Sequence, residues 1–376
     1  MHCADLPFAE DAFLERLQRW TTCESPTWDG LAIDRMLDIA ARDLVLAGAS
    51  VERIAGRMGF GGAVRGRFPH PKAAEPGLLV LAHLDTVHPV GTLGTLPWRR
   101  DGDRCEGPGI LDMKAGACLA VQAMEELAAA GIATPLPVTI LFTGDEEVGT
   151  PSTRDLIEAE ARRHRFVLVP EPARLNGDLV TGRYAIARFV VTTTGRPSHA
   201  GARLAEGRSA IRAMADRIIA IEEMTTEDCT FSVGVVRGGQ WVNCVATTCV
   251  AEVLSMAKRQ EDLDRGVAAM LAMAGSRNGV SFDVTRGVTR PVWEPKAGTL
   301  AMVATVQRLA SEMGLTIGHG SAGGGSDGNF TGALGIPTLD GLGAVGDGLH
   351  RLDEHIAIAA TLQRGRLLAG LLATLM

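Results

Sequence analysis

The chain has no apolar run long enough to cross a membrane as a helix, because about eighteen uninterrupted apolar residues occur nowhere in it. Residues 1–20 are acidic and amphipathic, and they lack the cationic segment and the following apolar run of a secretory leader. These two absences predict a cytoplasmic protein without a membrane partner.

Basic runs interleaved with aromatic residues are also absent. The 44 acidic residues outnumber the 37 basic ones and give a net charge of -7. A surface of this charge does not track a phosphate backbone. We therefore expect no nucleic acid among the partners of this protein.

Paired cysteines are missing as well. The seven cysteines are an odd number, scattered from Cys3 to Cys249 without a Cys-x-x-Cys pair. This spacing predicts neither a disulfide framework nor a thiolate zinc site. Cys105 and Cys118 are expected to be buried or half-buried small apolar residues.

The first part of the chain alternates strands with helices. With 376 residues the chain is too long for one ordinary core, which predicts two domains, or three. The apolar runs "GLLVLAHLD", "PVTILFTGDEE" and "FVLVPEPA" are separated by helical stretches at about 114–130 and 153–164. Short apolar runs separated by helices are typical of a parallel sheet that is covered on both faces, and so of an α/β fold.

A second domain is predicted within the first. Residues 186–287 read as strand, helix, two strands, helix and strand, the β-α-β-β-α-β order of a small ferredoxin-like α+β sandwich. The α/β alternation then resumes through a strand at "LTIGHG" to a C-terminal helix. We predict a first domain of residues 1–181 and 291–376 and an inserted domain of residues 182–290, with short crossings that serve as hinges.

Candidate ligands follow the ends of the predicted parallel strands, where open sheets bind their ligands. They are His83, Asp85, Asp112, Glu146, Glu147, Glu171 and His350. Each one alone is compatible with a helix cap or a solvated turn. Together they crowd several acids into one crevice, which is costly unless cations neutralise them.

Two imidazoles and three carboxylates, one of them bridging, match the ligand count of a site for two divalent metal ions. Mixed nitrogen and oxygen ligands suit zinc, with cobalt or manganese as alternatives. One carboxylate of the Asp-Glu-Glu segment is then free to act as a base.

These residues lie in segments that resemble those of a known family. "HLDTV", "GPGILDMKAG", "TGDEEVGT", "EPA", "GRPSHAG" and "GGGSDGNF", with His350 near the end, resemble the M20 metallopeptidases, most closely their glutamate carboxypeptidase and acetylornithine deacetylase branch. The resemblance covers residue 77 to the C-terminus. It implies a mainly parallel-sheet zinc-peptidase catalytic domain with an inserted lid and dimerisation domain, a homodimer, and cleavage of an amide bond in a small peptide or N-acyl amino acid.

The resemblance also implies a role for each candidate ligand. His83 and Glu171 would bind one zinc ion, Glu147 and His350 would bind the other, and Asp112 would bridge them.

Three further residues would act in catalysis by the same resemblance. Asp85 would hold the His83 ring through a hydrogen bond, and Glu146 would be the general base that later returns the proton to the departing nitrogen. His199 of the "SHAG" segment would donate to the oxyanion across a dimer, although a plain surface histidine is the alternative.

Substrate contacts are implied for Asn243, for Arg290, which would receive the substrate carboxylate, and for Gly325, whose loop permits close backbone approach. His88 has no assigned role and is interpreted as a turn residue.

Two other functional classes compete with this one. The loop Gly323–Gly328 satisfies G-x-G-x-x-G and suggests a dinucleotide-binding oxidoreductase, but only about six residues separate it from the next turn, too few for the long helix of such a unit. A non-catalytic binding protein on the same fold is the third class.

The inserted domain departs from the family pattern. Relatives that cleave C-terminal glutamate carry Asp-x-Arg where this chain has Leu254-Ser255-Met256, and Ala246 replaces the usual proline after the asparagine. This departure predicts that a neutral C-terminal residue is preferred over glutamate.

Overall fold

The computed structural model describes residues 5–376, so Cys3 lies outside the described residues. The chain divides into two compact units. The larger unit runs to Gly182 and resumes over Glu294–Ala322 and Ser326–Met376, and the smaller unit comprises Arg183–Trp293 with Gly323–Gly325. None of the helices formed by residues 5–376 combines the length and apolarity that crossing a membrane requires.

The larger unit is built on a six-stranded sheet that is mainly parallel. Its strands, in spatial order, are β1 (Ser50–Ile54), β2 (Ala63–Arg67), β6 (Val138–Thr143), β3 (Gly77–His83), β7 (His164–Leu168) and β15 (Thr338–Leu339). Four strands, from β6 to β15, run parallel, whereas β1 and β2 pair antiparallel at one edge. The parallel part agrees with the expectation from the apolar runs.

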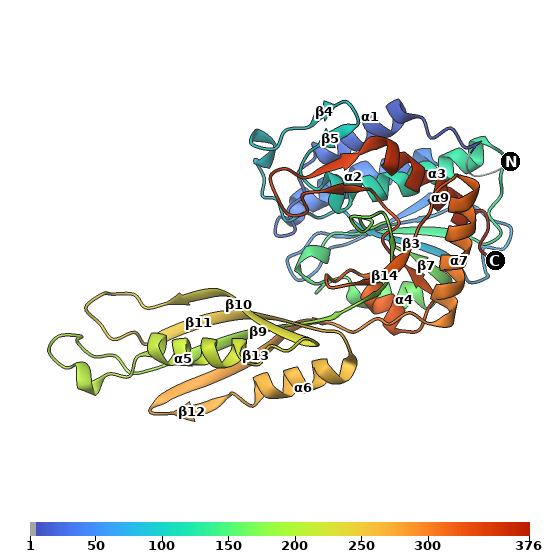
Figure 1. The fold of residues 1–376 in the computed structure, drawn as a ribbon. Helices are drawn as coiled ribbons and strands as arrows, with labels where there is room; N and C mark the ends of the chain where they lie inside the picture. The colour runs from blue at the N-terminus through green and yellow to red at the C-terminus, as the bar shows by residue number, and fades with distance from the viewer. Residues whose placement is uncertain (1–4) are drawn as a thin grey trace. The chain divides into compact units, whose positions relative to one another are not determined.

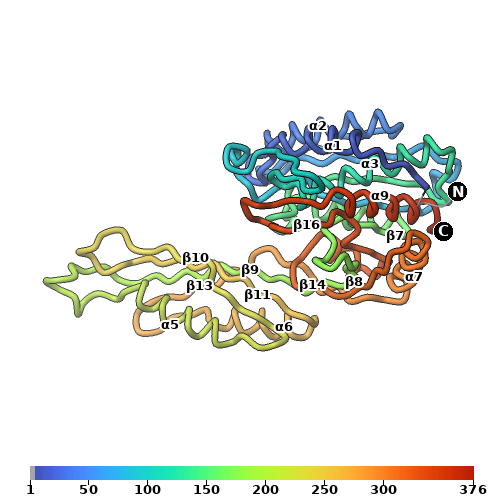
Figure 2. The backbone as a smooth tube through the Cα atoms, turned by 45° about the horizontal axis from the view of Figure 1, so that its top comes forward, coloured from blue at the N-terminus to red at the C-terminus, as the bar shows by residue number. Residues whose placement is uncertain are grey.

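Helices cover both faces of this sheet. Leu78 and Val80 of β3 belong to a core shared with α1 (Glu10–Thr21), α2 (Gly30–Leu46), α3 (Ala115–Ala129), α7 (Ala297–Glu312) and α9 (Ile358–Leu372). Leu79 and Leu81 face the other way and pack with Ile157 of α4 (Arg154–Ala161). Figures 1 and 2 show α1, α2, α3 and α9 grouped together. Because both faces of β3 are buried, its sequence is an unbroken apolar run.

Short strands and helices complete the larger unit. They are β8 (Leu179–Arg183) with β14 (His319–Ala322), the four-stranded sheet of β4 (Arg99–Asp101), β5 (Arg104–Glu106), β16 (Gly346–Asp347) and β17 (His355–Ala357), and the short helices η2 (Thr92–Gly94), η3 (Ile110–Lys114), η4 (Glu146–Val148) and α8 (Gly328–Ala333). The strand expected at "LTIGHG" begins only at His319. Its first residues instead cap α7, because the Leu315 amide donates to the Ala310 carbonyl after Gly314 adopts a positive φ.

The smaller unit has the expected ferredoxin-like order. Its elements are β9 (Ala185–Thr194), the short η5 (Leu204–Glu206), α5 (Ala210–Glu222), β10 (Cys229–Gly238), β11 (Thr248–Ala257), α6 (Gln260–Leu271), the additional β12 (Gly275–Arg277) and β13 (Val280–Arg290). The strands form one antiparallel sheet in the order β10-β11-β9-β13-β12. The predicted fold class, an α/β domain with an inserted α+β sandwich, is confirmed.

One face of the smaller sheet carries its core. Phe189 and Val253 are buried there with residues of α5 and α6, which lie on the same side of the sheet in Figure 1. Ile186, Arg188 and Met256 point to the opposite face, because side chains alternate along a strand.

Candidate metal centre

His83 ends β3 and is held by Asp85, two residues later. His83 is 1% exposed, and its Nδ1 lies 3.0 Å from the Asp85 carbonyl oxygen and 3.3 Å from Asp85 Oδ1. The same carboxylate accepts hydrogen bonds from the backbone amides of Glu146 (3.2 Å) and Glu147 (3.1 Å) and from the Thr27 hydroxyl (2.8 Å). Asp85 therefore holds the imidazole ring through its carbonyl oxygen and its carboxylate, and the same carboxylate holds the turn that carries the two glutamates.

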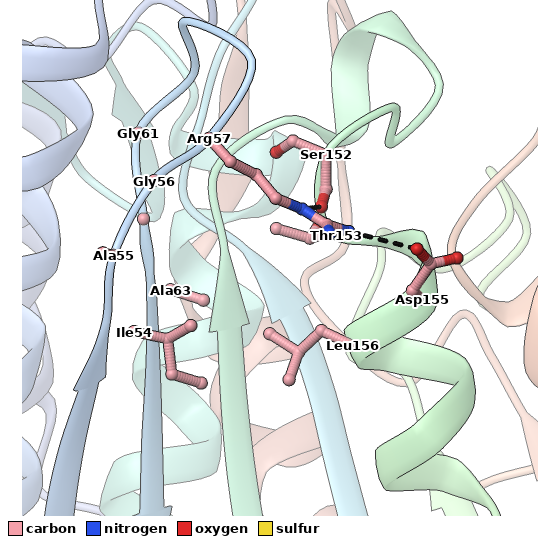
Figure 3. Close-up of a pocket in the computed structure, with 11 residues that line it drawn as sticks. Ile54, Ala55, Gly56, Arg57, Gly61, Ala63, Ser152, Thr153, Asp155 and Leu156 are labelled. Carbon is pink, nitrogen blue, oxygen red and sulfur yellow. Dashed lines mark hydrogen bonds and ion pairs between the residues drawn. The ribbon is translucent and has the colours of Figure 1, made fainter.

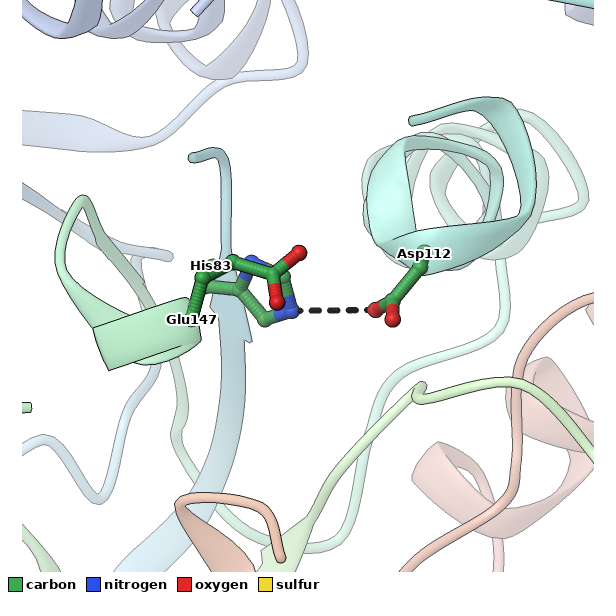
Figure 4. Close-up of side chains that lie close together, drawn as sticks. All are labelled: His83, Asp112 and Glu147. Atoms are coloured by element: carbon green, nitrogen blue, oxygen red, sulfur yellow. Dashed lines mark hydrogen bonds and ion pairs between the residues drawn. The ribbon is translucent and has the colours of Figure 1, made fainter. Parts of the chain in front are cut away.

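Asp112 lies between the two candidate ligand histidines. His83 Nε2 is 3.2 Å from Asp112 Oδ1, and His350 Nε2 is 3.3 Å from Asp112 Oδ2. Figure 4 shows the Asp112 carboxylate pointing toward His83 and Glu147. Each oxygen of Asp112 thus serves a different histidine, which is the arrangement a bridging carboxylate needs.

The remaining carboxylates lie close to the same two histidines. Glu171 Oε1 lies 3.6 Å from His83 Nε2, whereas Glu147 Oε2 lies 3.3 Å from His350 Nε2. Glu146 Oε2 is 4.0 Å from His83 Nε2. The candidate ligand atoms of His83, Glu146 and Glu171 lie within 4.8 Å of one another, as do those of His83, Asp112 and Glu147.

The pKa values of the carboxylates in this cluster reflect their burial and their closeness to one another. Burial, reinforced by the negative charge of Asp112, raises the pKa of Glu147 to about 8 and raises the pKa of Glu171 well above its usual range. Burial opposes ionisation of Asp112 too, but hydrogen bonds from His350 and His83 outweigh it and lower the pKa of Asp112.

The two imidazoles respond to the same carboxylates. Hydrogen bonds to Asp112 and Glu147 raise the pKa of His350 to about 10. Burial opposes a charge on His83, but Asp112, Asp85 and Glu171 together raise its pKa well above the usual value.

His88 is not a plain turn residue. It is 6% exposed, and its Nε2 lies 2.8 Å from Oε2 of Glu354, which is 1% exposed. Sequence reasoning missed Glu354 altogether. The available signal was a second acid soon after His350.

The smaller unit brings His199 and Asn243 together. The Ala200 amide donates to the Asn243 carbonyl at 2.9 Å, and both predicted residues are exposed. The Gly201 and Ala202 amides donate to His199 Nδ1 at 3.2 and 3.1 Å. Because Nδ1 accepts these two hydrogen bonds, the neutral His199 ring carries its proton on Nε2, and Nε2 can act as a donor.

Arg290 and Gly325 also lie together in the smaller unit. Arg290 is 3% exposed, and a Cβ atom at Gly325 would lie 2.7 Å from Arg290 Cδ and from Ile186 Cδ1. Any side chain at position 325 would therefore displace the arginine or the isoleucine.

The glycine-rich loop does not have the structure that a dinucleotide-binding unit requires. It leads into α8, which has six residues and is too short for a dinucleotide-binding unit.

A pocket of about 310 Å³ between the β1–β2 loop and the start of α4 is lined by none of the predicted site residues. In it Arg57 donates to the Ser152 carbonyl and pairs with Asp155 (Figure 3). The six cysteines among the described residues are free, and Cys105 and Cys118 are buried as expected.

Residues 79–374 match the family described as Peptidase family M20/M25/M40. Carboxypeptidase G2 of Pseudomonas sp. (strain RS-16) is 28% identical over 369 residues, which cover 94% of this chain and 87% of that protein. A succinyl-diaminopimelate desuccinylase of Acidovorax ebreus (strain TPSY) is 26% identical over 348 residues, with 86% and 88% covered. The M20 family metallo-carboxypeptidase Sso-CP2 of Sulfolobus solfataricus shares the fold, with a TM-score of 0.77 at 16% identity over 96% of this chain and 98% of that chain.

Proposed function

The chain belongs to peptidase family M20/M25/M40 and is a metallo-hydrolase of that family, and from this premise we propose that it cleaves an amide bond in a small peptide or N-acyl amino acid. The observation that carries the proposal is the arrangement of candidate ligands around Asp112, whose two carboxylate oxygens each lie close to a histidine, with Glu171 3.6 Å from His83 and Glu147 3.3 Å from His350. The named relatives, a carboxypeptidase and a desuccinylase, support this class of substrate.

Two divalent ions, zinc in our proposal, would be held by these five residues, with Asp112 shared between them. When bound, such ions supply an acidified water and polarise the carbonyl group under attack. Cobalt and manganese accept the same nitrogen and oxygen ligands and are expected to substitute.

Glu146 is proposed as the general base. It is 8% exposed, its backbone amide donates to Asp85, and its Oε2 lies 4.0 Å from His83 Nε2, so its carboxylate lies beside the ligand cluster rather than in open solvent. It would accept a proton from the attacking water and then deliver that proton to the departing nitrogen.

His199 is proposed to stabilise the developing oxyanion. The two amides that donate to its Nδ1 leave Nε2–H as the donor, which is the tautomer that this role requires. We propose that it acts in the neighbouring subunit of a homodimer, with Asn243 of the adjoining loop holding the substrate.

Arg290 is proposed to receive the substrate carboxylate, and Gly325 is proposed to line the site where that carboxylate binds. A guanidinium group presents a planar fork that matches a carboxylate. Arg290 is 3% exposed and its side chain lies against Gly325, which restricts the positions that its guanidinium group can take.

Hydrolysis of a panel of N-acyl amino acids and dipeptides tests this function. Chelator-stripped protein is loaded with zinc, cobalt or manganese and compared with Glu146→Gln protein loaded in the same way. Turnover of at least one panel member by the wild type, and none by the variant, is expected. A loaded wild type that cleaves no amide, or that shows nicotinamide absorbance as purified, would contradict the proposal.

A further inference from the structure

A buried carboxylate lies behind the turn that carries Asp112. Glu354 Oε1 accepts hydrogen bonds from the backbone amides of Leu111 (2.8 Å) and Asp112 (3.0 Å), and Oε2 accepts one from the Gly109 amide (2.9 Å). The side chain is 1% exposed. A single carboxylate thus accepts from three backbone amides of the turn, including the amide of the bridging residue itself.

His88 completes the set of partners of this carboxylate. Its Nε2 lies 2.8 Å from Glu354 Oε2, so each carboxylate oxygen has two partners. A carboxylate accepts about four hydrogen bonds, and all of these places are filled. The Glu354 carbonyl also accepts from the Gly107 amide at 3.3 Å. The hydrogen-bonding capacity of the Glu354 carboxylate is therefore filled by protein groups, without any contact to a metal ion.

The segment that carries Glu354 also carries His350. Immediately after Glu354, β17 pairs with β5 through His355 and Glu106, which anchors the segment next to the Asp112 turn. His350 Nε2 lies 3.3 Å from Asp112 Oδ2, and the Asp112 backbone amide donates a hydrogen bond to Glu354. One short stretch of chain therefore holds the bridging aspartate at its main chain and at its side chain.

We propose that Glu354, oriented by His88, is a positioning residue that sets Asp112 in register with His350, so that both metal positions form together. The inference rests on the proposed function, because it presupposes the two-ion centre. Partners of metal ligands that orient them typically contribute 10- to 100-fold in metal affinity. Since Asp112 is shared by the two positions, loss of Glu354 would weaken both of them and not one alone.

Four variants separate positioning from plain stability. Glu354→Ala removes all the acceptors. Glu354→Gln keeps one oxygen for the Leu111 and Asp112 amides but turns a donor toward Gly109, and His88→Ala removes only the orienting ring. Glu24→Ala is the matched control, because Glu24 holds two backbone amides of a different loop, those of Gly91 (2.8 Å) and Leu93 (2.9 Å).

Two measurements on the full chain report the effect without turnover. Chelator-stripped protein is titrated with Co²⁺, followed by its visible absorption, and amide exchange of the metal-free protein is measured by mass spectrometry for a peptide spanning residues 107–112. Glu354→Ala is expected to bind both Co²⁺ ions roughly 10- to 100-fold more weakly and to exchange faster over 107–112. Glu354→Gln and His88→Ala are expected to fall between it and the wild type, whereas Glu24→Ala keeps wild-type Co²⁺ affinity.

The outcomes distinguish this inference from the proposed function. If wild-type protein binds no Co²⁺ pair, the two-ion centre itself is wrong. If the wild type binds two ions and Glu354→Ala binds them with the same affinity, only the positioning role is overturned. A Glu354→Gln protein as weak as Glu354→Ala would also contradict a clamp built from backbone amides. Should Glu354→Ala fail to fold, the His88→Ala and Glu354→Gln comparisons decide alone.

Discussion

Changing Met256 to arginine is expected to shift substrate preference toward a C-terminal glutamate. Met256 of β11 pairs with Ile186 of β9, which in turn pairs with Arg290 of β13. The three side chains therefore form one row on the same face of the sheet, with Met256 two strand spacings, roughly 9.5 Å, from Arg290. A substrate whose carboxylate is held by Arg290 can extend along this row toward position 256.

The magnitude follows from the missing charge. A hydrogen bond to a charged group contributes roughly 1.5 to 3 kcal/mol, and each 1.4 kcal/mol is a factor of about ten. Methionine offers no such bond to a side-chain carboxylate, and its flexible thioether suits neutral groups. We expect wild-type kcat/KM for neutral C-terminal residues to exceed that for glutamate by about tenfold or more, and Met256→Arg to move this ratio by roughly ten- to 150-fold toward glutamate.

Competing arginines can be separated experimentally. Arg237 and Arg259 are held by acids, Arg237 by Glu252 at 2.8 Å and Arg259 by Asp262 at 2.8 Å. Arg188 lies two residues from Ile186 on the same face, so Arg188→Gln is the control for a second source of positive charge. Specificity constants for N-acyl glutamate, alanine and leucine substrates measure the effect. A wild-type enzyme that prefers glutamate, or a Met256→Arg enzyme with an unchanged ratio, would refute the role given to Met256.

Three further results are expected. Glu146→Gln should keep its bound metal and lose turnover by orders of magnitude, whereas Glu147→Gln should lose metal affinity; equal metal loss in both proteins, measured by elemental analysis, would end this division of roles. His199→Ala should lower kcat about 100-fold or more, and mixing it with Glu146→Gln should restore partial activity through hybrid sites; no recovery after verified subunit exchange would place His199 within its own chain. Phe142→Ala should lower the free energy of unfolding by about 3 to 5 kcal/mol in urea titrations. The reason is that Phe142 is fully buried and packs edge-to-face with Trp20, with 5.7 Å between the ring centroids. A loss below about 1 kcal/mol would contradict this expectation.

Much of the fold could be predicted because its strands carry strong patterns. The run at β3 is buried on both faces, and the run at β9 alternates between a core face and an open face, so each has a recognisable period. The strands β1 and β2, next to each other at one side of the six-stranded sheet, and the short strands of the four-stranded sheet were not predicted. They are two to five residues long, and several are exposed, so no apolar period distinguishes them from loops.

The candidate site divides in a similar way. His83, Asp112 and Glu171 could be proposed from sequence because each follows a predicted strand or glycine-rich turn, and strand ends meet at one edge of a parallel sheet. The contact of His88 with Glu354, 266 positions apart in the chain, could not, because no motif of the sequence links a turn histidine to this acid. The other partners of Glu354 are backbone amides, which have no residue-type signature.

Metal content measures the central claim most directly. Protein purified without chelator is analysed for zinc, cobalt and manganese, then stripped, assayed and reloaded. We expect close to two divalent ions per chain, loss of turnover on stripping, and recovery on reloading. A stoichiometry near zero in protein that retains full activity would contradict a hydrolase that works through a metal pair.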